Sequence, residues 1–346
     1  MKPAGVIGAG SFGITVANLL AENTDVLLFS RKEQVVHQIN NTHQQLGYAM
    51  SHRVTATTDL KLICGSCDVI FLVVPSGAMR STVQAMSPYL RPYHIIIHGT
   101  KGLDTSLIKD EDLEQGHFDI KQVCTMSEVI AQESTVLRIG CMAGPNLAKE
   151  ILQGLPAASV IASEFDEVIK MGQDLLTSKR FTIFGSYDLR GAEISGSYKN
   201  IIALASGIIS GLGLGKNMEA LLITRGLSEM IEYGTSLGLS GQAFFGAAGL
   251  GDLIATSTSD KSRNFAFGYR FAKGETREEI IKSSVEVVEG VRTLKIIYFM
   301  AKHHQIALPI TNLLYRVIYE DFDVKKAIEI LMSIPNAPDV DFNIVR

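Results

Sequence analysis

The stretch AGVIGAGSFGITVANLL, residues 4–20, decides the fold of the first part of this 346-residue chain. It begins as an apolar strand, turns through GAGSFG (8–13) and continues with a helical pattern. In such a turn Gly8 permits the tight bend, Gly10 lets the backbone approach a pyrophosphate, and Gly13 lets the helix pack against the strand. The N–H groups at the helix N-terminus favour phosphate. The stretch therefore predicts a dinucleotide-binding turn.

Apolar runs of the same kind recur through the first half of the chain, and helical patterns separate several of them. The further strand candidates are residues 25–30, 68–74, 94–98, 137–142, 158–162 and 181–184. The clearest helical patterns cover 11–22, 77–86 and 164–176. Strands without polar alternation are typical of a parallel sheet that is covered on both faces. The alternation predicts a doubly wound α/β domain.

The pattern changes near residue 190, where strand-like runs nearly vanish. Helical periodicity dominates over 193–209, 217–237, 277–283, 290–303 and 310–320, and we expect loops at GLGD (249–252) and over 256–265. We therefore predict a Rossmann-type α/β domain over residues 1–190. An all-α domain follows over residues 191–346, and the polar residues described below are the reason that we expect it to bind substrate and carry the catalytic groups.

The residues after the second strand bear on the choice of cofactor. An acidic residue at this place would hold the ribose 2′-hydroxyl of NAD. This chain has Arg31 and Lys32 instead, which suit the 2′-phosphate of NADP. The sequence therefore favours NADP(H) and leaves NAD(H) open.

Composition excludes several other classes of protein. The net charge of −4 gives no general basic field, so we expect no nucleic-acid partner. Cys64 and Cys67 form a C-x-x-C without a second pair, so we expect no metal site. The apolar run 201–214 is too short to span a membrane, and no signal peptide is apparent. These features indicate a cytoplasmic protein.

Several polar residues stand in apolar or glycine-rich settings. Lys199 precedes the apolar run IIALASGII, where burial would depress its pKa and suit proton transfer. Asp252 follows two glycines, and Arg263 lies between Ser262 and Asn264, a combination suited to phosphate or carboxylate. Lys101 follows the fourth strand, at the sheet edge where ligands bind in such folds.

Taken together, these motifs resemble those of the NAD(P)-dependent glycerol-3-phosphate dehydrogenases of the bacterial biosynthetic type. The resemblance runs nearly end to end. Its motifs are GAGSFG (8–13), VVPS (73–76), TKGL (100–103), GPNLAKE (144–150), YKNIIALASGIISGLGLGKN (198–217), ITRGLSEM (223–230), GLGDL (249–253), TSTSDKSRN (256–264) and VEG (288–290).

The resemblance implies reversible NAD(P)H-dependent reduction of dihydroxyacetone phosphate to sn-glycerol 3-phosphate, the backbone for phospholipid synthesis. It implies that Lys199 is the catalytic proton donor and acceptor. The substrate-binding residues it implies are Lys101, Gly144, Asn146, Asp252, Thr256, Ser262, Arg263 and Asn264. The cofactor-binding residues are Gly8, Gly10, Ser11, Phe12, Gly13, Arg31, Lys32, Lys101, Ala148, Arg263, Val287 and Glu289.

The chain departs from the family pattern at two positions. Asn146 stands where the bacterial pattern usually has Ser or Thr, and Tyr198 stands where an apolar residue commonly precedes the catalytic lysine. The segment from Pro335 to Arg346 has no assigned function, and we expect it to be extended or disordered.

Two other functions remain open from the sequence. The chain could be another Rossmann-plus-helical reductase that acts on a β-hydroxy acid, or a non-catalytic nucleotide sensor. The resemblance also implies a homodimer whose small-molecule substrate is dihydroxyacetone phosphate or sn-glycerol 3-phosphate.

Overall fold

The computed structural model describes residues 2–284 and 287–333, and its first half is built on one sheet. The strand order is β10-β9-β8-β7-β6-β1-β2-β5, and a two-stranded hairpin, β3-β4, stands apart. The bounds are β1 Ala4–Ile7, β2 Val26–Phe29, β3 Gln44–Gln45, β4 Tyr48–Ala49, β5 Val54–Thr57, β6 Val69–Leu72, β7 Ile95–His98, β8 Arg138–Ala143, β9 Ala157–Ser163 and β10 Phe181–Ser186.

The strands from β5 to β8 in this order all run parallel, which confirms the doubly wound arrangement. Strand β9 runs antiparallel to β8, and β10 is parallel to β9. Val6, Phe71 and Ile97 enter one apolar cluster of the core, and Ile7 and Ile96 enter another. Because neighbouring residues of a strand point to opposite faces, both faces of the sheet are buried. This double burial explains the continuous apolar runs of the sequence.

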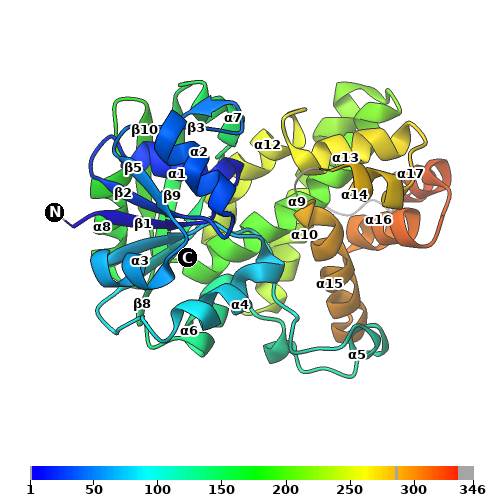
Figure 1. Cartoon of the computed structure of the whole chain (residues 1–346). Coiled ribbons are helices and arrows are strands. Elements are labelled where there is room, and N and C mark those ends of the chain that lie inside the picture. The colour runs from blue at the N-terminus through cyan, green and yellow to red at the C-terminus, as the bar shows by residue number, and fades with distance from the viewer. Residues whose placement is uncertain (1, 285–286, 334–346) are drawn as a thin grey trace.

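Helices of the first half cover the two faces of the sheet (Figure 1). Their bounds are α1 Ser11–Leu20, α2 Glu33–Thr42, α3 Leu60–Ser66, α4 Ser76–Met86, α5 Asp110–Gln115, α6 Met126–Glu133, α7 Ala148–Leu152 and α8 Asp166–Leu176, with a 3₁₀ turn, η1, at Ile120–Gln122. Helix α5 is the exception, because it packs against α15 (Glu289–His304) of the second half.

After β10 ends at Ser186, the described chain continues only as helices and connecting segments. The helices are α9 Leu189–Gly211, α10 Gly215–Ser236, α11 Gln242–Phe245, α12 Asp252–Ser257, α13 Arg263–Ala272, α14 Arg277–Ser283, α15 Glu289–His304, α16 Pro309–Tyr319 and α17 Val324–Met332. Residues Ala247–Gly251 form a π-helical turn, η2. The all-α second half is thus confirmed.

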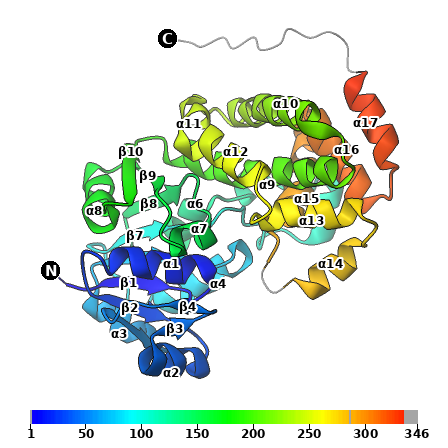
Figure 2. The same cartoon turned by 90° about the horizontal axis from the view of Figure 1, so that it is seen from above.

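Helix α9 lies at the centre of the second half, with α10, α12, α13 and α15 packed around it (Figure 2). Its contact with α13 requires glycine on both sides. A Cβ atom on Gly207 would lie 2.0 Å from the carbonyl oxygen of Phe265, and one on Gly268 would lie 2.0 Å from that of Leu204. This close crossing holds the start of α13 beside the middle of α9.

Two of the expected loops are wrong. GLGD (249–252) belongs to the π-helical turn and to the start of α12, and the 256–265 segment contains the end of α12 and the start of α13. The glycines that suggest a loop serve close packing instead, because a Cβ atom on Gly249 would lie 2.3 Å from the carbonyl oxygen of Phe244. Asp252 is therefore held on a helix.

The segment 335–346, for which we expected an extended or disordered chain, lies outside the described residues. Every helix within 2–284 and 287–333 is too short or too polar to cross a lipid bilayer.

Candidate active site

The turn after β1 has the geometry that the glycine motif predicts. Gly8 has a φ angle of +116°, and a Cβ atom there would lie 2.3 Å from the carbonyl oxygen of Val73. A Cβ atom on Gly13 would lie 1.8 Å from the carbonyl oxygen of Gly8. Gly10 brings no side chain to cap α1. The turn therefore keeps a backbone cradle at a helix N-terminus, which fits a pyrophosphate.

This cradle lies where the strand order reverses. Strand β1 lies between β2 and β6. From β1 the chain first adds β2 and β5 on one side of the sheet and then adds β6 and β7 on the other. The crevice beyond the carboxyl ends of such strands is the usual nucleotide site. The residues present thus fit a dinucleotide.

Other predicted cofactor residues lie around the turn. Arg31 and Lys32 follow β2 and are exposed to solvent. Ala148 begins α7, which packs against α1. Phe12 points across to the segment after β7, where a Cβ atom on Gly99 would lie 2.8 Å from the Phe12 ring. Ser11 is the first residue of α1.

A buried lysine–aspartate cluster joins the two halves of the molecule. The ammonium group of Lys199, on α9, donates hydrogen bonds to Oδ1 of Asp252 and, at 2.5 Å, to Oγ1 of Thr256. Lys101, which follows β7, donates to Oδ2 of Asp252 at 2.5 Å and to the carbonyl of Gly144 at 3.0 Å. One carboxylate thus lies between two ammonium groups.

The surroundings of Lys199 tune its charge. The pKa of Lys199 is lowered from 10.5 to about 7, chiefly by burial and also by the nearby ammonium group of Lys101. The carboxylate of Asp252 opposes these effects by stabilising the charged form. A lysine with a pKa near neutrality can both give and accept a proton under physiological conditions.

Gly144 and Asn146 follow β8 and lie at the edge of this cluster. Gly144 has a φ angle of +123°, a conformation that turns its carbonyl toward Lys101. The side-chain nitrogen of Asn146 donates to Oγ of Ser159 at 2.9 Å, whereas its Oδ1 is buried without a hydrogen-bond partner among the described residues. A buried acceptor without a donor is costly, so this atom is suited to a ligand hydroxyl.

The Ser262–Asn264 segment forms the N-terminus of α13. Ser262 caps the helix by accepting from the backbone N–H of Phe265 at 3.3 Å. Asn264 is buried, and its amide donates to Oδ1 of Asn200, the neighbour of Lys199, at 2.9 Å. Arg263 is exposed and donates to the carbonyl oxygen of Val287 at 3.1 Å. The segment therefore presents one exposed guanidinium group at a helix N-terminus.

Glu289 contacts the first half of the chain directly. Its carboxylate accepts from the backbone N–H of Ser76 at 2.8 Å and from the Ser76 hydroxyl at 2.7 Å. It thereby caps α4, whose own N-cap residue, Pro75, supplies no side-chain hydrogen bond. Arg292 donates to the same hydroxyl at 3.2 Å. Our sequence analysis missed Arg292 and the contact by which Glu289 caps α4 at Ser76, because a cap from a distant helix leaves no local signal.

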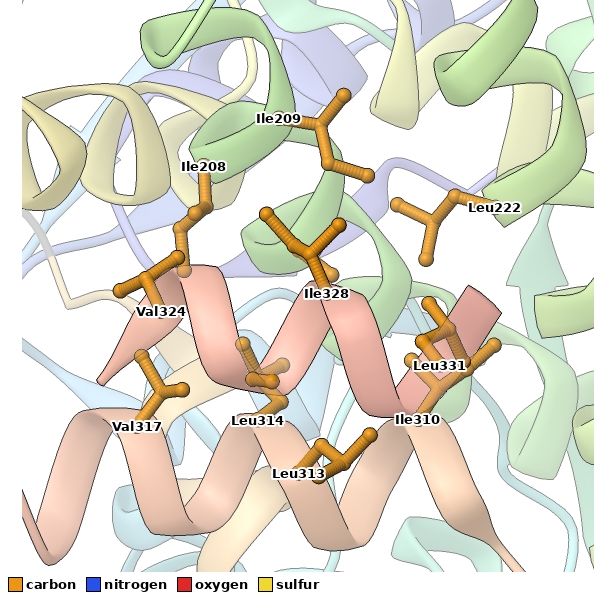
Figure 3. Close-up of a pocket in the computed structure, with 12 residues that line it drawn as sticks. Ile208, Ile209, Leu222, Ile310, Leu313, Leu314, Val317, Val324, Ile328 and Leu331 are labelled. Atoms are coloured by element: carbon orange, nitrogen blue, oxygen red, sulfur yellow. The ribbon is translucent and has the colours of Figure 1, made fainter. Parts of the chain in front are cut away.

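Two cavities lie away from the lysine–aspartate cluster. One of about 60 Å³, between α9, α10, α16 and α17, has an all-aliphatic lining that includes Ile208, Leu314 and Leu331 (Figure 3). The other, of about 520 Å³, lies between α15, α16 and α17 and is lined by residues such as Tyr298 and Arg316. Neither contains a predicted site residue, so the candidate site remains the lysine–aspartate cluster.

The two cysteines of the C-x-x-C motif lie away from the site and are free, buried thiols. Burial raises the pKa of Cys64 to about 11 and that of Cys67 to about 12. Both thiols are therefore protonated at neutral pH and unreactive.

Comparison with known proteins identifies the family. The model for the N-terminus of NAD-dependent glycerol-3-phosphate dehydrogenases matches residues 3–169, and the model for the C-terminus of these enzymes matches residues 188–329. The chain is 37% identical to glycerol-3-phosphate dehydrogenase [NAD(P)+] of Saccharophagus degradans, over 97% of this chain and 91% of that protein.

Further relatives agree with this result. The protein of the same name from Staphylococcus aureus is 37% identical over 95% of this chain and 97% of its own length. The crystal structure of glycerol-3-phosphate dehydrogenase from Coxiella burnetii superimposes with a TM-score of 0.86 at 32% identity, over 96% of this chain and 99% of that one. These matches confirm the resemblance that the motifs indicate, and the chain belongs to the NAD-dependent glycerol-3-phosphate dehydrogenase family.

Proposed function

We propose that this chain reduces dihydroxyacetone phosphate reversibly to sn-glycerol 3-phosphate and that Lys199 donates the proton. The observation that carries the proposal is the Lys199 ammonium group, which is buried beside Asp252 and has a pKa of about 7. The activity is that of its family, an oxidoreductase that depends on NAD(P), and it supplies the backbone for phospholipid synthesis.

A dinucleotide held at the Gly8–Gly13 turn would supply the hydride that the carbonyl carbon of the substrate needs. Lys199 stabilises the negative charge that develops on the carbonyl oxygen and gives that oxygen a proton. In the reverse direction the neutral amine accepts the proton. Asp252 keeps Lys199 in place, and because it also binds Lys101, it orients two cations toward the same region.

We assign the remaining contacts by chemistry. The unpartnered Oδ1 of Asn146 accepts a hydrogen bond from a substrate hydroxyl. Arg263 and the N-terminus of α13 bind the substrate phosphate, with Ser262 and Asn264 shaping this turn. Gly144 orients Lys101, and Thr256 orients Lys199.

The cofactor contacts follow the cradle. Gly8, Gly10, Ser11, Phe12 and Gly13 hold the pyrophosphate side of the dinucleotide. Arg31 and Lys32 lie exposed after β2 and support a preference for NADP(H) over NAD(H). Ala148, Val287 and Glu289 complete the cofactor site at its edge.

We further propose that the functional boundary between the nucleotide half (1–190) and the helical half (191–346) lies near residue 190, at the start of α9. On the same family basis we propose a homodimer in the cytoplasm. Gel filtration with light scattering would test the dimer, because a single monomeric species at micromolar concentration would contradict it.

The test of function mixes the purified chain with dihydroxyacetone phosphate and either NADPH or NADH, and follows loss of reduced-nicotinamide absorbance. We expect rapid loss that disappears in Lys199→Ala. If the folded protein binds NADPH without turnover of this substrate, the assignment is wrong. A panel of β-hydroxy acids would then separate a different reductase from a nucleotide sensor.

A further inference from the structure

A buried polar cluster lies directly behind the catalytic lysine. Tyr198, the residue before Lys199, is fully buried, and its hydroxyl lies 3.0 Å from Oε2 of Glu229 on α10 and 2.7 Å from Oγ1 of Thr311 on α16. We call Tyr198, Glu229 and Thr311 the anchor cluster. Tyr198 is one of the two departures from the family pattern, and the proposed reaction gives it no role.

Glu229 ties three helices together. Besides the hydroxyl of Tyr198, its carboxylate accepts hydrogen bonds from the backbone N–H groups of Ile310 and Thr311 and from the hydroxyl of Thr311. These N–H groups belong to the first turn of α16, whose N-cap residue, Leu308, provides no side-chain cap. Glu229 therefore caps α16 from α10 and at the same time receives Tyr198 from α9.

The packing of α9 explains why such a tie is needed. A helix with one apolar face is oriented by burying that face. Between Gly191 and Ile209, however, every residue of α9 is buried, so no single apolar face orients the helix, and its rotation depends on the glycine crossing with α13 and on buried polar contacts. Buried polar contacts are directional and penalise a rotation that breaks them. Successive side chains on a helix point about 100° apart. The hydroxyl of Tyr198 thus fixes the direction in which Lys199 leaves the helix.

We propose that Tyr198, Glu229 and Thr311 are positioning residues that set the rotation of α9 and thereby the place of the Lys199 ammonium group relative to Asp252. The inference rests on the proposed role of Lys199. It adds that the accuracy of proton transfer depends on a hydroxyl that touches neither substrate nor cofactor. Without the anchor, α9 turns slightly, the Lys199–Asp252 contact lengthens, and the carboxylate raises the pKa of the lysine less.

The test compares Tyr198→Phe with Tyr233→Phe. Tyr233 is a matched control because it is also fully buried and lies beside Tyr198, with ring centroids 5.6 Å apart. Its hydroxyl contacts the sulfur of Met300 rather than the anchor cluster. Both variants lose one buried hydroxyl, and only the first removes a hydrogen bond that joins α9 to neighbouring helices.

For Tyr198→Phe we expect kcat for reduction to fall about five- to twentyfold. A displacement of a catalytic group on the order of 1 Å costs roughly 100-fold, and a slight turn of α9 moves the ammonium group less than that. KM for dihydroxyacetone phosphate should stay within about twofold, and the pH at which reduction declines should move down by about half a unit or more. Tyr233→Phe should leave the pH profile unchanged. Thr311→Ser, which retains a hydroxyl, should keep most of the activity, whereas Thr311→Val should resemble Tyr198→Phe.

Rates are expressed per NADPH-binding site, well below the melting temperature, so that loss of folded protein does not count as loss of kcat. If both tyrosine variants lower stability equally and neither moves the pH profile, the cluster is only structural and the proposal is wrong. An inactive wild type, or an active Lys199→Ala, would instead overturn the proposed function. NMR titration of ¹³Cε-labelled lysine in the two tyrosine variants would then test the inference. A lower pKa of Lys199 in Tyr198→Phe than in Tyr233→Phe would support it, and equal pKa values would contradict it.

Discussion

Replacement of Asp252 by asparagine tests the electrostatics of the site most directly. The carboxylate accepts hydrogen bonds from both Lys199 and Lys101, and it raises the pKa of Lys199 against burial and against the second ammonium group. Asparagine keeps the shape of the side chain and removes its charge. Two forces that lower the pKa of Lys199 then act without opposition.

The magnitude follows from the titration of Lys199. An opposite charge at contact distance shifts a pKa by roughly one to three units. If the pKa falls by about two units from its value near 7, the protonated fraction at pH 7 falls from about one half to about one hundredth. A more acidic lysine also donates its proton faster, which offsets part of this loss. We therefore expect reduction at pH 7 to slow by roughly tenfold to fiftyfold.

The assay is kcat/KM for reduction of dihydroxyacetone phosphate between pH 5 and 9. Because the donor must be protonated, the wild-type value should decline as the pH rises above about 7. In Asp252→Asn the decline should begin about two units lower. Thr256→Val is the control, because it removes the other hydrogen-bond partner of Lys199 without changing charge and should shift the profile far less. An unchanged profile in Asp252→Asn would refute the electrostatic account.

Further predictions concern the cofactor, the substrate and the stability of the fold. Arg31→Asp should lower kcat/KM with NADPH about 10- to 100-fold while sparing NADH, and an equal loss with both cofactors would contradict a 2′-phosphate contact. Asn146→Ala should raise KM for dihydroxyacetone phosphate about three- to tenfold but leave KM for hydroxyacetone phosphate, which lacks the hydroxyl, unaltered. Burial raises the pKa of Glu229 from 4.5 to about 7. The contribution of its protonated form to the free energy of unfolding is therefore full below pH 4.5 and is lost as the pH rises through 7. Urea unfolding should show that Glu229→Gln flattens this dependence, and an unaltered slope would show that Glu229 is ionised throughout. Ala327→Val should fill part of the 60 Å³ cavity and stabilise the fold by about 1 kcal/mol; a lower melting temperature would mean that the cavity cannot accept the methyl groups.

Local signals explain what could be predicted from the sequence. The strands, the glycine turn and the change to helices near residue 190 all follow from patterns within about twenty residues, and the structure confirms these elements. The prediction that Asp252 lies in a loop is wrong, since Asp252 begins α12. The error arises because a glycine-rich segment suggests a loop when its packing partners are unknown. The edge strand β5, Val54–Thr57, escapes the sequence analysis because Thr55 and Thr57 interrupt the continuous apolar run by which the other strands are recognised.

Contacts between distant segments were beyond the reach of such patterns. The motif residues Lys101, Lys199 and Asp252 were each identified as candidates, but nothing local shows that one carboxylate binds both lysines. The cap that Glu289 provides to Ser76 joins residues more than two hundred positions apart. Glu229 likewise shows no trace in the sequence of its contacts with α9 and α16. A side chain that satisfies the backbone of another helix is chosen by tertiary geometry.

The position of Lys199 on a fully buried helix combines a chemical need with a structural difficulty. Burial is what brings the pKa of the lysine near neutrality, yet it also removes the apolar face that would orient the helix. Directional hydrogen bonds from two other side chains of α9 resolve this conflict. One turn and a half earlier on α9, the carboxylate of Glu193 accepts from the backbone N–H and the hydroxyl of Ser127, at the start of α6. Tyr198 provides the corresponding tie toward α10 and α16. The helix that carries the reacting amine is thus held by one contact to the sheet-bearing half and one within the helical half, so the position of the amine depends on how both halves are held together.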